Sequence, residues 1–210
     1  RNGFVMIPTV TFEEAEQLVI QQQDNWHIVR IDAGLDVEWY KDLCHETRQN
    51  YKLIKKDGYD TYQAIGLQHS EGAEDELYDS VQASASIDGK QITNKPPRSF
   101  VKINELGMKF KGLIDMYQKE FSKLQIFRTR ILVSKPLHLH AVHTDERGCR
   151  LHFPVQTHKH AIMWFGDDPY HMRADGSLYL CNTGKVPHNF GNLQRTVDRV
   201  HIVCGLGAQL

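Results

Sequence analysis

The spacing of apolar residues changes along the chain, from mainly helical to strand-like. Before residue 126, three segments carry apolar residues every three or four positions, which is the period of an amphipathic helix. From Ile126 onward, short apolar runs are separated by turn residues, and no helical segment intervenes. Repeated strands of this kind favour an antiparallel sandwich or barrel. We therefore expect a mainly β protein with flanking helices.

Capping signals predict two helices in the first fifty residues. Thr11 and Glu14 have the spacing of a capping box ahead of an apolar face, and Asp36 can cap the second helix. Segments 3–7, 26–31 and 62–68 predict short strands. The remainder of 51–89 contains several glycines and an acidic run, which favours a loop. Such a long irregular segment is a candidate lid over a substrate.

The strongest helical period spans residues 103–121. Its apolar positions are Ile103, Leu106, Phe110, Leu113, Tyr117 and Phe121. Gly107 and Gly112 should each weaken this helix by about 1 kcal/mol relative to alanine. We expect the helix to brace the outer face of a sheet with its apolar stripe.

Five strands are expected in the C-terminal part, at 126–134, 149–155, 161–166, 177–182 and 199–204. Residues 167–169 and 174–176 have the composition of hairpin turns. Jelly rolls and cupins have this architecture, so we predict a double-stranded β-helix core. A length of 210 residues suits one domain. Within it, residues 1–97 would supply helices, strands and the possible lid, and 98–210 the bracing helix and the catalytic core.

Composition excludes some classes of function. The formal net charge is -1, which gives no overall attraction to nucleic acid or an anionic membrane. Apolar runs stay far below the roughly 18 residues of a membrane span. The four cysteines lack C-x-x-C spacing, which indicates neither a disulfide framework nor a zinc knuckle. We expect a cytoplasmic protein that binds neither nucleic acid nor membrane.

Candidate metal ligands lie between the predicted strands. His143 and Asp145 are two residues apart, so in an extended segment both side chains could reach one ion. His188 follows 43 residues after Asp145 and would return from another strand. Two imidazoles and one carboxylate on one face of a metal are the ligand set of non-haem Fe(II) oxygenases. Arg199 is spaced to direct its guanidinium into the same cavity, where it would suit a carboxylate.

Neighbouring basic residues extend this candidate site. Arg150 and His152 alternate along one predicted strand, so their side chains share a face. Arg128 and Arg130 also alternate, and one of them could bind an anionic group of a substrate. An ordinary surface position for these two arginines is an equally good interpretation. The pair His158 and His160 falls in a predicted turn, and solvation explains it better than a second metal.

Four sequence blocks resemble the aspartyl/asparaginyl β-hydroxylase family of 2-oxoglutarate/Fe(II) oxygenases. They are R-T-R-I-L-V-S-K-P at 128–136 with H-T-D at 143–145, C-R-L-H-F-P-V-Q-T at 149–157, L-C-N-T-G-K-V-P-H-N-F-G-N at 180–192, and R-V-H-I-V at 199–203. The resemblance covers roughly residues 98–205. Two departures are visible: Pro136 precedes Leu137 where relatives commonly have glycine, and Asp145 is present although some members lack this carboxylate.

The resemblance implies a fold, an activity and residue roles. It implies a jelly-roll dioxygenase that uses Fe(II), 2-oxoglutarate and O2 to hydroxylate an unactivated C–H bond of an amino acid, free, peptidyl or carrier-bound, with release of succinate and CO2. His143, Asp145 and His188 would bind the iron, and Arg199 the far carboxylate of 2-oxoglutarate. In relatives, Arg150 and His152 line the same pocket. Asp145 argues against the halogenating branch, in which a small residue leaves room for halide.

Two other classes of function fit the residues. A cupin-like isomerase or sensor would bind metal with the same barrel and would not need Arg199. A metal-free binding module would keep every activity after His143→Ala. Binding of 2-oxoglutarate together with a metal separates the oxygenase from both.

Overall fold

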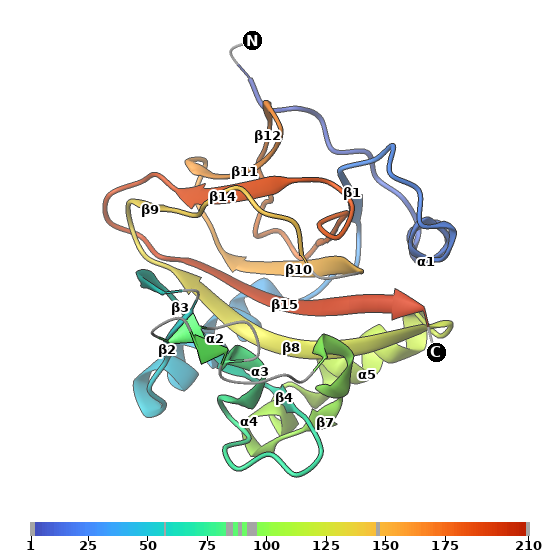
Figure 1. The fold of residues 1–210 in the computed structure, drawn as a ribbon. Helices are drawn as coiled ribbons and strands as arrows, with labels where there is room; N and C mark the ends of the chain where they lie inside the picture. Colours follow the sequence, from blue (N-terminus) through green and yellow to red (C-terminus); the bar gives the residue numbers. More distant parts are fainter. Residues whose placement is uncertain are drawn as a thin grey trace.

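Two antiparallel sheets face each other, and helices cover the outer face of the larger one (Figure 1). The computed structural model describes residues 3–56, 58–82, 86–87, 90–91, 96–145 and 148–208. The mainly β architecture and its antiparallel pairing confirm the predicted fold class.

The larger sheet joins strands from both halves of the chain. Its order is β1 (Ile28–Ile31), β13 (Leu178–Cys181), β10 (Cys149–Gln156), β15 (Arg199–Ala208), β8 (Leu124–Ser134), β3 (Tyr59–Gly66) and β2 (Ile54–Lys56). The smaller sheet has the order β12 (Asp168–Tyr170), β11 (Ala161–Phe165), β14 (His188–Asn192) and β9 (His138–Leu139). Two short pairs are β4 (Gln68–His69) with β7 (Lys102–Ile103) and β5 (Ser86–Ile87) with β6 (Lys90–Gln91).

The capping signals mark real helix starts. The helices are α1 (Phe12–Gln21), α2 (Val37–Asn50), α3 (Asp79–Gln82), α4 (Glu105–Met108), α5 (Lys111–Glu120) and the 3-10 turn η1 (Pro97–Ser99). Thr11 Oγ1 accepts from Glu14 N at 3.1 Å, and Glu14 Oε2 accepts from Thr11 N at 2.7 Å. Asp36 Oδ1 accepts from Trp39 N at 3.0 Å. Both caps satisfy backbone N–H groups that the first helical turn leaves without partners.

The five C-terminal strands are confirmed, but three local predictions are wrong. Residues 3–7 form no strand. The first predicted turn lies one residue earlier, because Asp168 and Pro169 already belong to β12. Part of the expected loop in 51–89 is sheet, since β2 and β3 extend the larger sheet beside β8. Residues 57, 83–85 and 88–89 of that loop lie outside the described residues.

The predicted helix at 103–121 is broken into α4 and α5. Ile103 instead pairs with Gln68 in the β4–β7 pair. Asn104 then starts a new helix, its side-chain oxygen accepting from Gly107 N at 2.7 Å. The α5 half does brace the sheet, with buried Leu113, Ile114 and Tyr117 in the core under β8. Tertiary contacts of residue 104 and its neighbours therefore override a continuous helical period.

The two glycines of this segment are expected to respond oppositely to alanine. A Cβ at Gly107 would lie 2.1 Å from the Leu67 carbonyl oxygen, whereas a Cβ at Gly112 would have no neighbour within 4 Å. Gly112→Ala should therefore raise the unfolding free energy by up to ~1 kcal/mol, while Gly107→Ala should lower it by about 1–3 kcal/mol. Urea denaturation of both variants checks this. Equal effects at the two positions would contradict the close approach to Leu67.

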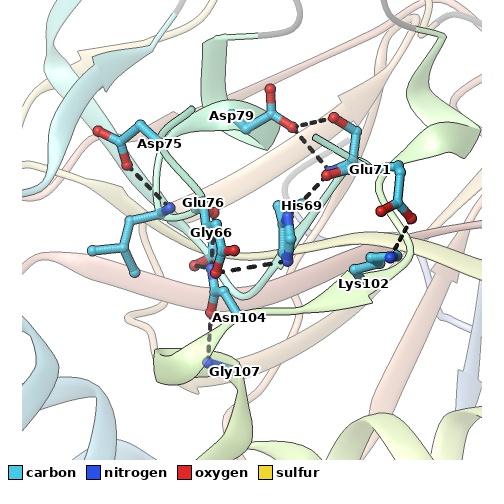
Figure 2. Close-up of polar contacts among 11 residues, drawn as sticks. Gly66, His69, Glu71, Asp75, Glu76, Asp79, Lys102, Asn104 and Gly107 are labelled. Carbon is cyan, nitrogen blue, oxygen red and sulfur yellow. Dashed lines mark hydrogen bonds and ion pairs between the residues drawn. The ribbon is translucent and has the colours of Figure 1, made fainter. Parts of the chain in front are cut away.

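Polar contacts fix the segment between β3 and α4. Asn104 Nδ2 donates to the carbonyl oxygens of Gly66 at 3.0 Å and Glu76 at 2.9 Å. Asp79 accepts from both the backbone N and the Oγ of Ser70, and Lys102 forms an ion pair with Glu71 (Figure 2). This described part of the predicted lid is therefore tied to the body of the protein through its backbone carbonyls. A covering role for the segment stays a prediction.

Alternation along the larger sheet separates an apolar face from a polar one. Leu151, Phe153 and Ile202 belong to the core under the helices. Arg150 and His152 alternate with them on β10, so they point into the space between the two sheets. The interior of the barrel therefore receives charged and imidazole side chains, which is where a functional site would lie.

Candidate functional site

His143 and His188 are held side by side by their backbones. Each donates its N–H to the carbonyl oxygen of the other at 2.9 Å, and their ring centroids are 4.4 Å apart. The strand end predicted at His143 is only this single bridge. His143 Nδ1 lies 2.9 Å from the Ala141 carbonyl oxygen, and His188 Nδ1 lies 3.2 Å from that of Val186. Because a carbonyl can only accept, both Nδ1 atoms donate, which leaves both Nε2 lone pairs for a metal.

Asp145 lies beside these rings but faces an arginine. Its N–H donates to the Thr183 carbonyl oxygen at 2.9 Å, and its Oδ2 accepts from Arg150 Nε at 3.1 Å. Burial alone would raise the pKa of Asp145, but the surrounding positive groups, Arg150 foremost, outweigh it and hold this pKa below its usual range. The carboxylate is therefore ionised at neutral pH.

One cavity between the sheets gathers most of the predicted site. It is lined by Arg130, His143, Asp145, Arg150, His152 and His188. As their side chains stand, no three His, Cys, Asp or Glu groups of the described residues enclose a metal position. The carboxylate of Asp145 is turned toward Arg150. A site of three ligands would need that carboxylate to turn toward the two imidazoles.

Arg199 lies in a second cavity that adjoins the first and is too narrow to leave space for a water molecule. Met163 lines both cavities, and His201 and Thr157 line the second with Arg199. The guanidinium carbon of Arg199 sits 5.1 Å from the Phe190 ring centroid. Burial lowers the pKa of Arg199 to about 10, so the side chain remains charged. Within the described part of the chain no carboxylate pairs with it, although a buried charge without a counter-ion is costly.

Other polar groups around Arg199 also lack partners. Arg199 stands opposite Ser134 in the β15–β8 register. The Oγ of Ser134, Oγ1 of Thr157 and Nε2 of His201 are buried without a hydrogen bond in the described structure. A guanidinium with hydroxyl and imidazole neighbours is well suited to a carboxylate, because each of them can donate to an anionic oxygen.

Two buried histidines connect the cavities and should make the fold sensitive to acid. His152 Nδ1 and His201 Nδ1 lie 3.4 Å apart. Burial, and next the positive charge of Arg199, lower the pKa of both rings well below the ordinary value. Below about pH 6.5 the unfolded chain then binds more protons than the folded one. The free energy of unfolding should therefore decrease as the pH is lowered, by up to about 1.4 kcal/mol per pH unit for each ring. His201→Gln should reduce that slope by about one proton, measured by urea denaturation between pH 5.5 and 7. An unchanged slope would mean that His201 is not buried as a neutral ring.

Arg128 does not line this site although Arg130 does. The β8–β15 pairing shifts from Val203↔Arg130 to Gly205↔Phe127, so β8 carries one extra residue here, and Arg128 takes a φ of +58°. Its Nε donates to the Ser80 carbonyl oxygen at 2.8 Å. Because of this bulge, two residues that are two apart in sequence no longer share a face.

Four other histidines lie near the candidate ligands in sequence, and His158 and His160 have the solvated positions expected of them. His138 and His140 alternate along β9 and pack with Tyr59, Tyr62 and Phe190. His158 and His160 are exposed in the turn before β11. Only His140 among these four lines the cavity of His143 and His188.

Sequence reasoning missed several residues that line the cavity. They are Lys56, Tyr62, Leu132, His140, Met163, Phe190 and Val203. Lys56 and Tyr62 come from β2 and β3, and the Lys56 ammonium lies 5.4 Å from the Tyr62 ring centroid. The strand signal at 62–68 was visible, but its position beside β8 depends on pairing across about 70 residues, which no local pattern records.

Solved structures with similar folds include several oxygenases. A prolyl-4-hydroxylase from Pseudomonas putida has a TM-score of 0.56 and 11% identity, covering 93% of this chain and 100% of that chain. The dioxygenase for auxin oxidation 1 from Arabidopsis thaliana, with 2-oxoglutarate, has 0.54 and 14%, covering 98% and 94%. HygX from Streptomyces hygroscopicus, with nickel and 2-oxoglutarate, has 0.56 and 7%, covering 91% and 87%. The sequence matches no protein-family model and no curated protein.

These likenesses define the class of fold. The chain has the double-stranded β-helix fold of 2-oxoglutarate/Fe(II) oxygenases. At such low identities they establish the fold alone, and the activity has to be argued from the site. In the described residues no helix has the length and apolar character needed to cross a membrane.

Proposed function

We propose that this protein is a 2-oxoglutarate- and Fe(II)-dependent dioxygenase that hydroxylates an amino-acid residue or derivative, of the aspartyl/asparaginyl type by resemblance. The single observation that carries the proposal is the position of Arg199. Its buried guanidinium has no carboxylate partner among the described residues, and Met163 lines both its cavity and the cavity of the facing pair His143 and His188. A dicarboxylate that reaches from the imidazoles to Arg199 would neutralise this charge.

The residues present fit the implied metal. His143 and His188 offer Nε2 lone pairs because their Nδ1 atoms donate to backbone carbonyls, which is the usual arrangement of metal-bound histidine. Asp145 would complete the face by exchanging its contact with Arg150 for the metal. Bound Fe(II), with 2-oxoglutarate and O2, supplies the oxidation of an unactivated C–H bond and yields succinate and CO2.

The protein's own residues would position the reactants. Arg199, helped by Ser134, Thr157 and His201, would hold the far carboxylate of 2-oxoglutarate. Arg150 and His152 line the cavity between that carboxylate and the ligands. Arg130 also lines it, and we assign it to an anionic group of the substrate. Packing of Phe190 and Met163 against the site would exclude water from the reacting atoms.

The cellular setting follows from composition. All four cysteines are free and buried, which suits a reducing compartment. We therefore propose a cytoplasmic enzyme.

An anaerobic titration tests the proposal. Adding 2-oxoglutarate to the Fe(II)-loaded protein should produce a weak visible charge-transfer band, and admitting O2 should convert 2-oxoglutarate to succinate. A cupin-like isomerase or sensor would bind the metal without the band, and a metal-free module would bind neither. Either result would refute the oxygenase assignment.

A further inference from the structure

Three exposed leucines form a patch on the outer face of the smaller sheet. Leu137, Leu139 and Leu193 are 66%, 55% and 44% exposed. Leu139 stands opposite Gly191 in the β9–β14 register, and the side chains of Leu139 and Leu193 flank Gly191, each about 3 Å from where its Cβ would lie. Leu137 N–H donates to the Gln194 carbonyl oxygen at 3.1 Å. These residues, the leucine patch, are therefore contiguous, and clustered exposed apolar side chains mark interaction sites.

The backbone conformation of Leu137 is unfavourable for a residue that has a side chain. Its φ is +61°, a left-handed conformation that glycine adopts freely and leucine does not. Packing inside the protein does not repay this cost, because two thirds of the side chain is in solvent. Strained residues of this kind persist where a function outside local stability selects them. We take the exposed Leu137 side chain to be a contact for a partner.

The charge around the patch indicates the chemistry of that partner. Lys135, Lys159 and Arg195 are exposed. Lys135 and Arg195 are each two residues from a leucine of the patch, and Leu193 N–H donates to the His160 carbonyl oxygen, which brings the segment of Lys159 alongside. No acidic residue occurs in segments 134–142, 157–162 or 189–197, and Asp60 in the adjoining segment 59–61 forms an ion pair with Lys55. An apolar centre with a basic rim fits a polypeptide whose apolar side chains are flanked by Asp or Glu.

The patch is directly joined to the proposed active site through one strand. His138 and His140 point inward from β9 and its end, and His140 lines the cavity of the proposed ligands. Leu139 points outward between them. Val142, 69% exposed, directly precedes His143. A chain bound on the patch would thus lie one strand away from residues that line the cavity.

We propose that the leucine patch is the docking surface for a polypeptide substrate that carries apolar and acidic residues. That the bound polypeptide is a substrate rests on the proposed function, whereas the docking surface is inferred from the exposed leucines alone. The proposal selects a peptidyl substrate over a free amino acid, since a free amino acid would have no use for a surface outside the cavity.

Peptide selection tests this directly. A random peptide library displayed on phage is panned against the protein, and the most enriched peptide is synthesised with a fluorescent label for polarisation titrations. We expect enriched sequences to combine apolar and acidic residues, and Leu139→Asp to weaken binding by about tenfold or more. Met108→Asp is the matched control, because Met108 on α4 is also 55% exposed, and it should bind as the wild type does.

Leu137→Gly separates binding from folding. Glycine removes the strain at φ +61°, so the melting temperature should rise while peptide binding falls about tenfold. No enrichment, or enriched peptides that bind Leu139→Asp normally, would overturn the proposal. A dimer in sedimentation that Leu139→Asp dissociates would also overturn it, since the occupant would then be a second copy. Nickel-supported 2-oxoglutarate binding, measured on the same variants, should not change; its absence in the wild type would refute the oxygenase and leave the peptide result intact.

Discussion

Arg199→Met is expected to abolish measurable 2-oxoglutarate binding while the fold stays at least as stable. Methionine fills a similar volume, and replacing a buried charge that lacks a partner by an apolar side chain should not destabilise the protein, because such a charge is costly. The lost contact is a charge-assisted pair of hydrogen bonds to the far carboxylate, worth roughly 3 kcal/mol, so affinity should fall more than about 100-fold. Isothermal titration of the nickel-loaded protein with 2-oxoglutarate measures this directly.

Arg195→Met is the matched control for Arg199. Arg195 is exposed in the loop between β14 and β15, so its loss should leave 2-oxoglutarate affinity unchanged. Thermal shifts give a second measurement, because a ligand that binds only the folded state raises the melting temperature by mass action. 2-Oxoglutarate should stabilise the wild type and the Arg195 variant but not Arg199→Met. Normal affinity in Arg199→Met would remove this residue from the site.

Local signals predicted the elements of this fold well. The Thr11–Glu14 capping box and the Asp36 cap act within four residues of sequence, and the structure forms both. Strands β8, β10 and β15 have apolar residues at alternate positions because their outer face packs under helices. Such patterns need no knowledge of the partner strand, which explains why sequence alone could find them.

The failed predictions each depend on contacts distant in sequence. The helix at 103–121 breaks because Ile103 pairs with Gln68 and Gly107 packs on the Leu67 carbonyl. Arg128 does not share the face of Arg130 because β8 carries an extra residue at this point, and that bulge depends on the pairing with β15. Periodicity describes one element at a time, so it cannot detect a neighbour that interrupts it.

Only part of the candidate site was predicted, because contacts distant in sequence bring its other residues to the cavity. Spacing and the family resemblance together selected His143, Asp145, His188, Arg150 and His152, which now line one cavity. Lys56 and Tyr62 escaped because strand pairing, rather than any motif, brings the first half of the chain to the cavity. The sequence also did not predict that Met163 separates Arg199 from the cavity of the other site residues, since this depends on how β11 lies across the barrel.

Removing either imidazole of the facing pair is expected to eliminate divalent metal binding. His143→Ala or His188→Ala would leave one imidazole of the facing pair and the Asp145 carboxylate, and even outer partners of ligands change affinity by 10–100-fold, so the loss should exceed about 100-fold. Electron paramagnetic resonance of Mn(II) counts free against bound ion without relying on turnover. Asp145→Asn should weaken binding less than either histidine variant, because an amide oxygen can still ligate although it carries no charge.

The His158–His160 pair provides the matched control for these ligands. Its ring centroids are 5.2 Å apart, comparable to the 4.4 Å of His143 and His188, but both rings are exposed and neither forms an ion pair with a carboxylate among the described residues. Replacing both by alanine should leave Mn(II) affinity unchanged. If that double variant loses the metal while His188→Ala retains it, the ion lies in the turn before β11 and the barrel interior has another role. A metal lost only with the facing pair would instead favour a turn of Asp145 away from Arg150, because no other acidic side chain of the described residues lines this cavity.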